Sequence, residues 1–308
     1  MNKDKGETGT ADCCADGHDA PALKLEDALA RILADVQPVD GVETVPVREA
    51  LGRVLVEDVV SQIDVPAHTN SAMDGYALRG ADLQVDADTR LDLIGVAAAG
   101  RPFDGAVGEG QCVRILTGAP LPTGADTVVM QERVTRQDDT AIIGVGQKPG
   151  QHVRQAGEDI ARGAVALTKG TVLMPAALGM LASVGVGEVS VRRRARVAFF
   201  STGDELQRVG QALDVGQIYD SNGYTIHGML TRAGVEVIDM GIVRDDPTAI
   251  ENAFADAAAR ADAIVTSGGV SVGDADYVKD MLDKTGSVGF WRVAIKPGRP
   301  LAFGRIGD

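Results

Sequence analysis

The sequence predicts a multidomain α+β protein, in which a β-rich N-terminal half is followed by a three-layer α/β domain. Its 308 residues suffice for two or three domains, and a hydrophobic fraction of 44% can bury a sizeable core. From about residue 43 to residue 168, short apolar runs are broken by Gly, Pro, Asp and Asn, as in strands with long connections. After residue 194, strand and helix patterns alternate, which calls for a parallel sheet with helices on its faces.

The N-terminal half contains two predicted helices and several short strands. Residues 1–22 are polar, so we expect a disordered leader and no secretory signal. A first helix is predicted because apolar residues recur at helical spacing until Pro38 ends the run. These residues are Leu25, Leu29, Ile32, Leu33 and Val36. Strands are expected at 53–56, 91–96, 112–115, 127–130 and 141–143. A second helix is expected from Pro175 to Gly185.

The C-terminal part has the order strand, helix, strand, helix, strand. Strands are expected at 197–200, 235–238 and 263–265, with a further one at 293–295. The first helix carries Ile226, Met229, Leu230 and Ala233 on one face and ends at Gly234, a natural C-terminal stop. Asp246 and Pro247 begin the second helix, as N-cap and first-turn residue. We therefore assign Asp246 to capping.

Composition excludes several classes of partner. A net charge of -14 argues against nucleic acid and against an anionic membrane surface. No apolar stretch approaches the ~18 residues of a membrane span, so we expect a cytoplasmic protein. Three cysteines do not make a disulfide framework, and Cys112 fits a strand core. Cys13 and Cys14 lack the usual spacing of metal ligands, so a disordered leader is favoured over a metal-binding tail.

A glycine-rich loop at residues 266–276 organises the C-terminal domain. It follows an apolar strand and precedes a helical pattern, an arrangement whose free N–H groups favour an anion such as phosphate. The loop also contains Asp274 and Asp276, which would repel phosphate unless a cation lies between them. The loop therefore predicts a site for phosphate and Mg²⁺. The simpler interpretation is a tight turn whose Asp caps a helix.

Other charged residues are expected at the same edge of the sheet. Loops that leave the carboxyl ends of parallel strands share one edge, and these loops carry Glu205, Asp245 and Asp276. Carboxylates so close together raise one another's pKa, and a divalent cation removes that cost. Lys296 and Arg299 would supply contacts to oxyanions. The alternative, in which each Asp caps a helix and each basic residue is solvated, is less favoured because the residues come from separate loops.

Seven stretches, taken together, resemble the molybdopterin molybdenumtransferase family, which includes the E-domain of gephyrin. They run in family order from about residue 23 to the end of the chain. The stretches are 71–76, 117–120, 154 with 157–160, 201–206, 217–222, 266–273 and 295–298. By spacing alone, Asp74 and Thr117 are ordinary turn residues; only the resemblance gives them a role.

The resemblance implies a reaction and a set of residues. Adenylylated molybdopterin is bound, molybdate is inserted at its dithiolene, and AMP is released with the help of Mg²⁺. The implied catalytic residues are Asp74, Thr117, Arg154, Asp159, Glu205, Asp245, Asp276, Arg292 and Lys296. The implied metal ligands among them are Glu205, Asp245 and Asp276. Binding of the pterin substrate is expected at Ser267, Gly268, Gly269, Ser271, Gly273, Asp274, Pro297 and Gly298.

The resemblance also implies a domain plan and an assembly. After the leader, residues 23–42 with 158–195 form a linker domain, 43–157 a β-rich domain, and 196–308 the α/β molybdopterin-binding domain. A homodimer is implied, in which Asp74, Thr117, Arg154 and Asp159 reach the site of the partner subunit. Contact with molybdopterin adenylyltransferase is expected as well, besides the small-molecule substrate.

One departure from the family keeps a second function open. Family members continue beyond the stretch at 303–304 into a Pro-Gly-Asn-Pro loop, a helix and a β-domain, and the sequence up to Asp308 has no such motif. We therefore expect an incomplete α/β domain and retain a non-catalytic molybdopterin-binding or scaffold module as the alternative. A third candidate, the sister enzyme that adenylylates molybdopterin, is disfavoured because it has no β-rich region of this kind.

Overall fold

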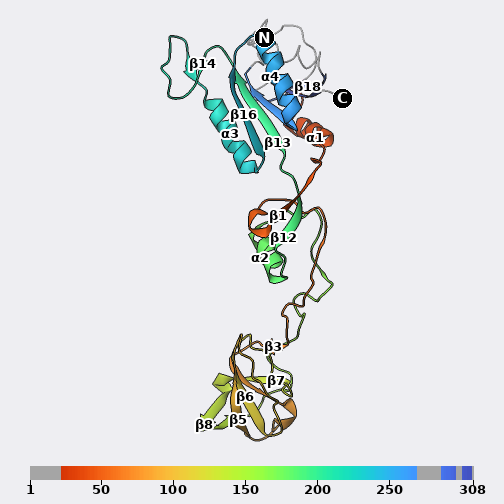
Figure 1. Cartoon of the computed structure of the whole chain (residues 1–308), viewed down its shortest axis with the longest axis vertical. Coiled ribbons are helices and arrows are strands. Elements are labelled where there is room, and N and C mark those ends of the chain that lie inside the picture. The colour runs from red at the N-terminus through yellow and green to blue at the C-terminus, as the bar shows by residue number, and fades with distance from the viewer. Residues whose placement is uncertain (1–21, 269–285, 296–299, 307–308) are drawn as a thin grey trace, which may run out of the picture. The chain divides into compact units, whose positions relative to one another are not determined.

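The computed structural model describes residues 22–268, 286–295 and 300–306 (Figure 1). The chain forms two compact units. One consists of Asp40–Arg193, and the other combines the chain up to Val39 with Arg194–Asp308. The leader with Cys13 and Cys14 lies outside the described residues.

The unit Asp40–Arg193 is built around a six-stranded sheet with the order β7-β4-β6-β5-β9-β8. Its strands are β4 (Gly75–Leu78), β5 (Thr89–Ala97), β6 (Gln111–Ile115), β7 (Thr127–Met130), β8 (Val134–Gln137) and β9 (Thr140–Ile143). All neighbours are antiparallel except β5 and β6. Strand β4, which lies between β7 and β6, is buried throughout, and Cys112 is a buried core residue of β6. The strands expected at 91–96, 112–115, 127–130 and 141–143 are confirmed.

The remaining elements of this unit are short. Its two-stranded pairs are β1 (Val42–Pro46) with β12 (Glu188–Arg192), β2 (Val59–Val60) with β11 (Val165–Leu167), and β3 (Asn70–Ser71) with β10 (Val153–Arg154). Its helices are α2 (Pro175–Ser183) and the short 3-10 helices η1 (Val47–Glu49), η2 (Gly80–Asp82) and η3 (Gln131–Arg133). The predicted helix from Pro175 is confirmed, and Leu181 is its buried residue.

The strand expected at 53–56 is wrong. Val54 and Leu55 form only isolated bridges, to Val172 and Val191 respectively. Their hydrogen bonds go to two different segments, since the Leu55 N–H donates to Thr171 while the Val54 carbonyl accepts from Arg192. This short apolar run therefore bonds to two different segments in turn, and it forms no ladder with either of them.

The second unit contains a parallel three-stranded sheet with the order β16-β13-β17. The strands are β13 (Arg196–Thr202), β16 (Glu236–Val243) and β17 (Ala263–Ser267), and the short pair β14 (Leu206–Gln207) and β15 (Ile218–Tyr219) follows β13. Phe199 and Phe200 of β13 point to opposite faces, because successive side chains of a strand alternate. Phe199 contacts His227 of α3 (Ser221–Ala233), and Phe200 contacts Phe254 of α4 (Pro247–Arg260).

The two helices therefore cover opposite faces of the sheet, as Figure 1 also shows. This is the three-layer arrangement that the sequence predicts, and the fold class is confirmed. The predicted helix ends are confirmed too. Gly234 caps α3 in the left-handed conformation at φ 77°, and the Asp246 side chain accepts a hydrogen bond from the Ala249 N–H at 2.9 Å.

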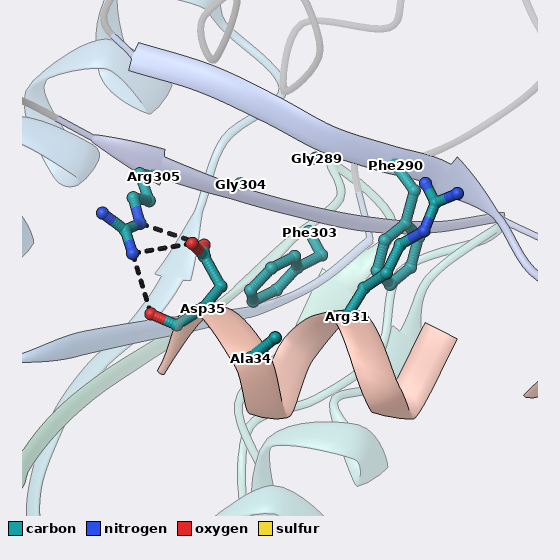
Figure 2. A pocket seen from close by; sticks show the side chains of 8 residues that line it. All are labelled: Arg31, Ala34, Asp35, Gly289, Phe290, Phe303, Gly304 and Arg305. Carbon is teal, nitrogen blue, oxygen red and sulfur yellow. Dashed lines mark hydrogen bonds and ion pairs between the residues drawn. The ribbon is translucent and has the colours of Figure 1, made fainter. Parts of the chain in front are cut away.

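The helix α1 (Leu25–Asp35) packs against the hairpin of β18 (Gly286–Arg292) and β19 (Pro300–Ile306). Figure 2 shows the Arg305 guanidinium reaching the Asp35 carboxylate, at 2.6 Å. The structure thus places α1 with the α/β unit, whereas the sequence analysis grouped residues 23–42 with 158–195. Residues 42–46 do pair with 188–192, so the boundary runs through the expected linker segment.

Two further expectations differ in detail. Residues 293–295 are no strand: β18 ends at Arg292, and Val293 makes a single bridge to Leu23. Of the five apolar residues expected along α1, only Ile32 packs into the cluster, with Ala28, while the other four are exposed. Helical spacing predicts the helix correctly but does not tell which neighbour covers its apolar side. No helix among the described residues is long and apolar enough to cross a membrane.

Candidate active site at the carboxyl edge of the parallel sheet

The turn after β13 brings carboxylates to the carboxyl edge of the sheet. Gly203 has φ 151°, and a Cβ built on it would lie 2.6 Å from a Glu205 carboxylate oxygen. The Glu205 side chain therefore folds back over Gly203, whose positive φ favours glycine at this turn. The next residue, Asp204, accepts a hydrogen bond from the Asp245 N–H at 3.3 Å. The turns after β13 and β16 thus meet, as the parallel arrangement predicts.

The surroundings at this edge change the pKa of the Asp245 carboxyl. Burial raises the pKa of its carboxyl above the ordinary value of 3.8, and the charges of Asp204 and Glu205 raise that pKa further. The raised pKa means that the ionised carboxylate is disfavoured here, first by burial and then by the two neighbouring negative charges. Such an environment favours a cation at this point.

The start of the glycine-rich loop lies beside the end of β13. Gly268 has φ 91°, and an added Cβ would lie 2.2 Å from the Thr202 carbonyl oxygen and 2.9 Å from Thr202 Oγ1. On the other side, Asn222 of α3 donates a hydrogen bond from Nδ2 to Ser267 Oγ at 2.9 Å. The first residues of the loop are therefore fixed between β13 and the first turn of α3, whose N-cap is Asp220.

Buried hydroxyl groups without partners mark the same edge. The hydroxyls of Ser201, Thr202 and Thr266 are buried and have no hydrogen-bond partner in the part of the chain that the structure describes. A buried hydroxyl that makes no hydrogen bond costs about 1–3 kcal/mol. Several of them at the ends of two neighbouring strands are typical of a site that polar ligand atoms or water complete.

Several predicted site residues lie outside the described residues. These are Gly269, Ser271, Gly273, Asp274, Asp276, Lys296, Pro297, Gly298 and Arg299. Arg292 is the last residue of β18. The described residues contain no group of three or more His, Cys, Asp or Glu side chains that could hold a metal ion. Of the predicted metal ligands, the structure places Glu205 and Asp245 at one edge, and Asp276 stays a prediction.

The other predicted residues lie in the unit Asp40–Arg193, where they form two pairs. Thr117 donates two hydrogen bonds to Asp74 Oδ1, one from its backbone N–H and one from its hydroxyl, both at 2.7 Å. The side-chain bond from Thr117, followed by the backbone bond, lowers the pKa of Asp74 below 3.8. Asp74 is therefore an exposed carboxylate that stays ionised.

The second pair is Arg154 with Asp159. Arg154 Nη2 donates to Asp159 Oδ1 at 2.5 Å, and Glu158 lies 3.6 Å from Arg154 Nε. The two pairs belong to neighbouring segments, because β10 with Arg154 pairs with β3, and the Gly118 N–H donates to the Ser71 carbonyl of β3. The structure thus brings together four residues that are spread over 86 positions of the sequence.

Spacing could not have identified the Asp74–Thr117 pair, since the two residues are 43 positions apart. The sequence gives Asn222 no role of its own, although it lies in the stretch 217–222, because an Asn in the first turn of a helix is usually a capping residue. The sequence feature that points to Asn222 is its position at the start of a predicted helix, next to the expected carboxyl edge of the sheet.

A cavity of the structure lies apart from these residues. It measures about 450 Å³ and lies between α1 and the β18–β19 hairpin (Figure 2). Its lining includes Arg31, Asp35, Phe290, Phe303 and Arg305, and none of the described site residues. The carboxylates, buried hydroxyls and glycine-rich turn that suit a functional site lie at the sheet edge, and the functional site is therefore assigned there and not to this cavity.

Replacing Asp245 by Asn is expected to stabilise the protein at neutral pH in the absence of divalent cations. The pKa of Asp245 is raised in the folded state, so its contribution to stability is fully present below pH 3.8 and is lost as pH rises through the folded-state pKa. The gain should stay below about 1 kcal/mol, because the carboxylate is exposed and screened by solvent. Thermal unfolding of Asp245→Asn and wild type at pH 4 and pH 7.5 measures this gain in stability. Glu251→Gln on α4 is the control. A lower melting temperature of Asp245→Asn at pH 7.5 would contradict the account.

Two family models together match most of the chain, and several named relatives are similar to it. Residues 23–185 match the MoeA N-terminal region (domain I and II), and residues 198–308 match the probable molybdopterin binding domain. The molybdopterin molybdenumtransferase of Haemophilus influenzae is 44% identical over 285 residues, which are 92% of this chain and 70% of that protein. The molybdopterin molybdenumtransferase of Nostoc sp. is 41% identical over 84% of this chain and 60% of its own length.

A solved structure of a molybdopterin biosynthesis MoeA protein from Pyrococcus horikoshii matches with a TM-score of 0.80 and 31% identity, over 93% of this chain and 73% of that one. The chain thus spans about 60% to 70% of the length of the first relatives it matches. Both halves match in the same order as in the family, which is the resemblance that the seven stretches predict. The chain belongs to the molybdopterin molybdenumtransferase family, a family of enzymes of molybdenum cofactor biosynthesis.

Proposed function

We propose that this protein inserts molybdenum into adenylylated molybdopterin and releases AMP, which gives the molybdenum cofactor. One observation supports this most directly. The carboxyl edge of the parallel sheet combines two meeting acidic turns, the start of the glycine-rich loop, and buried hydroxyls that have no partner among the described residues. The loop suits a phosphate, because Gly268 lets the backbone pass close to Thr202 and to a ligand. The acidic turns suit a metal that neutralises that phosphate.

Mg²⁺ fits the described part of this site. The pKa of Asp245 is raised by burial and then by its acidic neighbours, and a bound cation would offset that repulsion. We propose that Glu205 and Asp245 hold the ion, with Asp276 as the third predicted ligand. When bound, Mg²⁺ supplies Lewis acidity at the phosphate bridge between molybdopterin and AMP. Ser267, held by Asn222, would orient the substrate beside this bridge.

The homodimer is part of the proposal. In it, the Asp74–Thr117 and Arg154–Asp159 pairs contribute to the site of the partner subunit, and molybdopterin adenylyltransferase supplies the substrate by direct contact. The cytoplasm is the proposed location. Light scattering of the purified protein at micromolar concentration tests the assembly: a mass of twice 32.0 kDa is expected, and a mass of 32.0 kDa contradicts it.

A non-catalytic molybdopterin-binding module is the second candidate. The match of residues 198–308 to the probable molybdopterin binding domain favours it, since that description covers binding of the pterin and not transfer of molybdenum. The two functions differ in one assay. The protein is mixed with adenylylated molybdopterin, molybdate and Mg²⁺, and bound pterin and free AMP are measured. Release of AMP together with formation of molybdenum cofactor supports the transferase, whereas bound pterin without AMP supports the module.

A further inference from the structure

Arg114 connects the segments on both sides of Asp74. It lies in β6, directly opposite Tyr76 of β4 in the strand register. Arg114 Nη1 donates a hydrogen bond to the carbonyl oxygen of Gly75 at 2.7 Å, and Nη2 donates to Gln131 Oε1. Gly75 is the residue after Asp74, so the guanidinium holds the chain immediately beyond the carboxylate.

Gln131 also holds the backbone of Asp74, from the side of β7. Its backbone N–H donates to the Asp74 carbonyl oxygen at 3.0 Å, and its side chain is the second acceptor of Arg114. In the sheet order β7-β4-β6, Arg114 starts from β6 and Gln131 directly follows β7. The Arg114 side chain therefore spans the start of β4, where Asp74 leaves the sheet.

The position requires arginine specifically. The Arg114 guanidinium lies over the ring of the buried Tyr76, with 5.2 Å between the guanidinium carbon and the ring centroid. A planar guanidinium can stack on a ring and still donate in its own plane to two acceptors on different segments. A lysine has a single ammonium group and cannot hold the same three contacts.

Glycine at position 75 completes the arrangement. A Cβ there would lie 2.1 Å from the Val129 carbonyl oxygen, so the chain after Asp74 passes tightly against β7. The backbone around Asp74 is thus fixed by strand packing on one side and by Arg114 and Gln131 on the other. Thr117 then fixes the carboxylate itself.

We propose that Arg114 is a positioning residue for Asp74, which sets the place and orientation of the Asp74–Thr117 pair without touching the substrate. The proposal rests on the proposed function, in which Asp74 contributes to the site. It adds a residue to which neither motif spacing nor the family resemblance assigns a role.

A double-mutant cycle tests this inference. Arg114→Met is expected to lower the rate of AMP release from adenylylated molybdopterin by about tenfold, in kcat and not in KM, because misplaced groups slow the reaction without weakening substrate binding. In the Asp74→Asn background the same substitution should change the rate by less than about twofold, since residues that act as one unit are not additive. Arg114→Lys should fall between wild type and Arg114→Met.

Two controls separate this role from a general effect on folding. Arg136→Met removes an exposed arginine of β8 that also donates to a backbone carbonyl, that of Asp138, and it should leave the rate unchanged. A ¹³C NMR titration of the Asp74 carboxyl needs no activity. The pKa of Asp74 should rise in Arg114→Met and Arg114→Lys, and stay unchanged in Arg136→Met. If Arg114→Met does not fold, the same measurements on Arg114→Lys test the inference.

The outcomes are distinct. If Asp74→Asn slows the reaction and Arg114→Met slows it equally in both backgrounds, Arg114 does not act through Asp74 and the inference is overturned. An unchanged kcat in Arg114→Met or Arg114→Lys overturns it as well. If Asp74→Asn leaves the rate unchanged, the contribution of Asp74 to the proposed function fails first, and the inference with it.

Discussion

Gly268→Ala is expected to reduce AMP release by more than about 100-fold, because displacement of reacting groups by 1 Å can cost that much. The added Cβ would lie 2.2 Å from the Thr202 carbonyl oxygen, and the residue has φ 91°, which alanine rarely adopts. The chain must therefore move at the point where the glycine-rich loop leaves β17. Strain of this kind costs about 1–3 kcal/mol, so most of the protein should remain folded at 25 °C.

Gly234→Ala is the matched control for this prediction. Gly234 also has a positive φ, 77°, but an added Cβ would meet nothing within 4 Å. It lies at the end of α3 and away from the sheet's carboxyl edge. The substitution should cost stability of about 1 kcal/mol and leave the rate of AMP release unchanged. Equal losses of activity in the two variants would show that the rate follows overall stability, which would contradict a local role of Gly268 at the site.

Asp74→Asn is expected to lower AMP release by about 10- to 100-fold with little change in melting temperature, because the amide keeps the shape but not the charge of the group. The amide oxygen still accepts both hydrogen bonds from Thr117. The exposed position of Asp74 explains why the fold should tolerate the change. Asp139→Asn, at an exposed carboxylate 3.7 Å from Arg136, is the control and should have no effect. A wild-type rate in Asp74→Asn would remove this pair from the proposed function.

Thr117→Val should move the acid limb of the pH–rate profile to higher pH. The Thr117 hydroxyl is the first cause of the lowered pKa of Asp74, so its loss brings that pKa back toward 3.8. A carboxyl with a lowered pKa contributes stability that is present above 3.8 and is lost as pH falls through the folded-state value. Rates and melting temperatures followed from neutral pH to well below pH 3.8 measure both effects. An acid limb that stays in place would show that Asp74 does not titrate in the reaction.

Much of the fold follows from local patterns in the sequence. Asp246 before Pro247 predicted the start of α4, and Gly234 predicted the end of α3, because capping chemistry acts within one helix turn. The alternation of strand and helix predicted the parallel sheet and hence the meeting of the turns that carry Asp204 and Asp245. These features depend on neighbours that are close in sequence or on the handedness of a common connection.

The rest depends on contacts between distant segments. Nothing in the run at 53–56 shows that Val54 and Leu55 bond to two different segments, and nothing in α1 shows that the β18–β19 hairpin is its partner. The pair Asp74–Thr117 and the role inferred for Arg114 likewise depend on the order of strands in the six-stranded sheet. Pairing between strands is decided by packing of the whole unit, and hydrophobic spacing does not contain it.

The central claim is that the acidic carboxyl edge of the parallel sheet holds Mg²⁺ for the release of AMP. The most direct measurement is AMP release from adenylylated molybdopterin and molybdate as a function of Mg²⁺ concentration, in wild type and in Glu205→Gln. The account predicts release that stops when Mg²⁺ is chelated and a loss of at least about 100-fold in the variant at any Mg²⁺ concentration. Release that is independent of Mg²⁺, or a wild-type rate in Glu205→Gln, would contradict it.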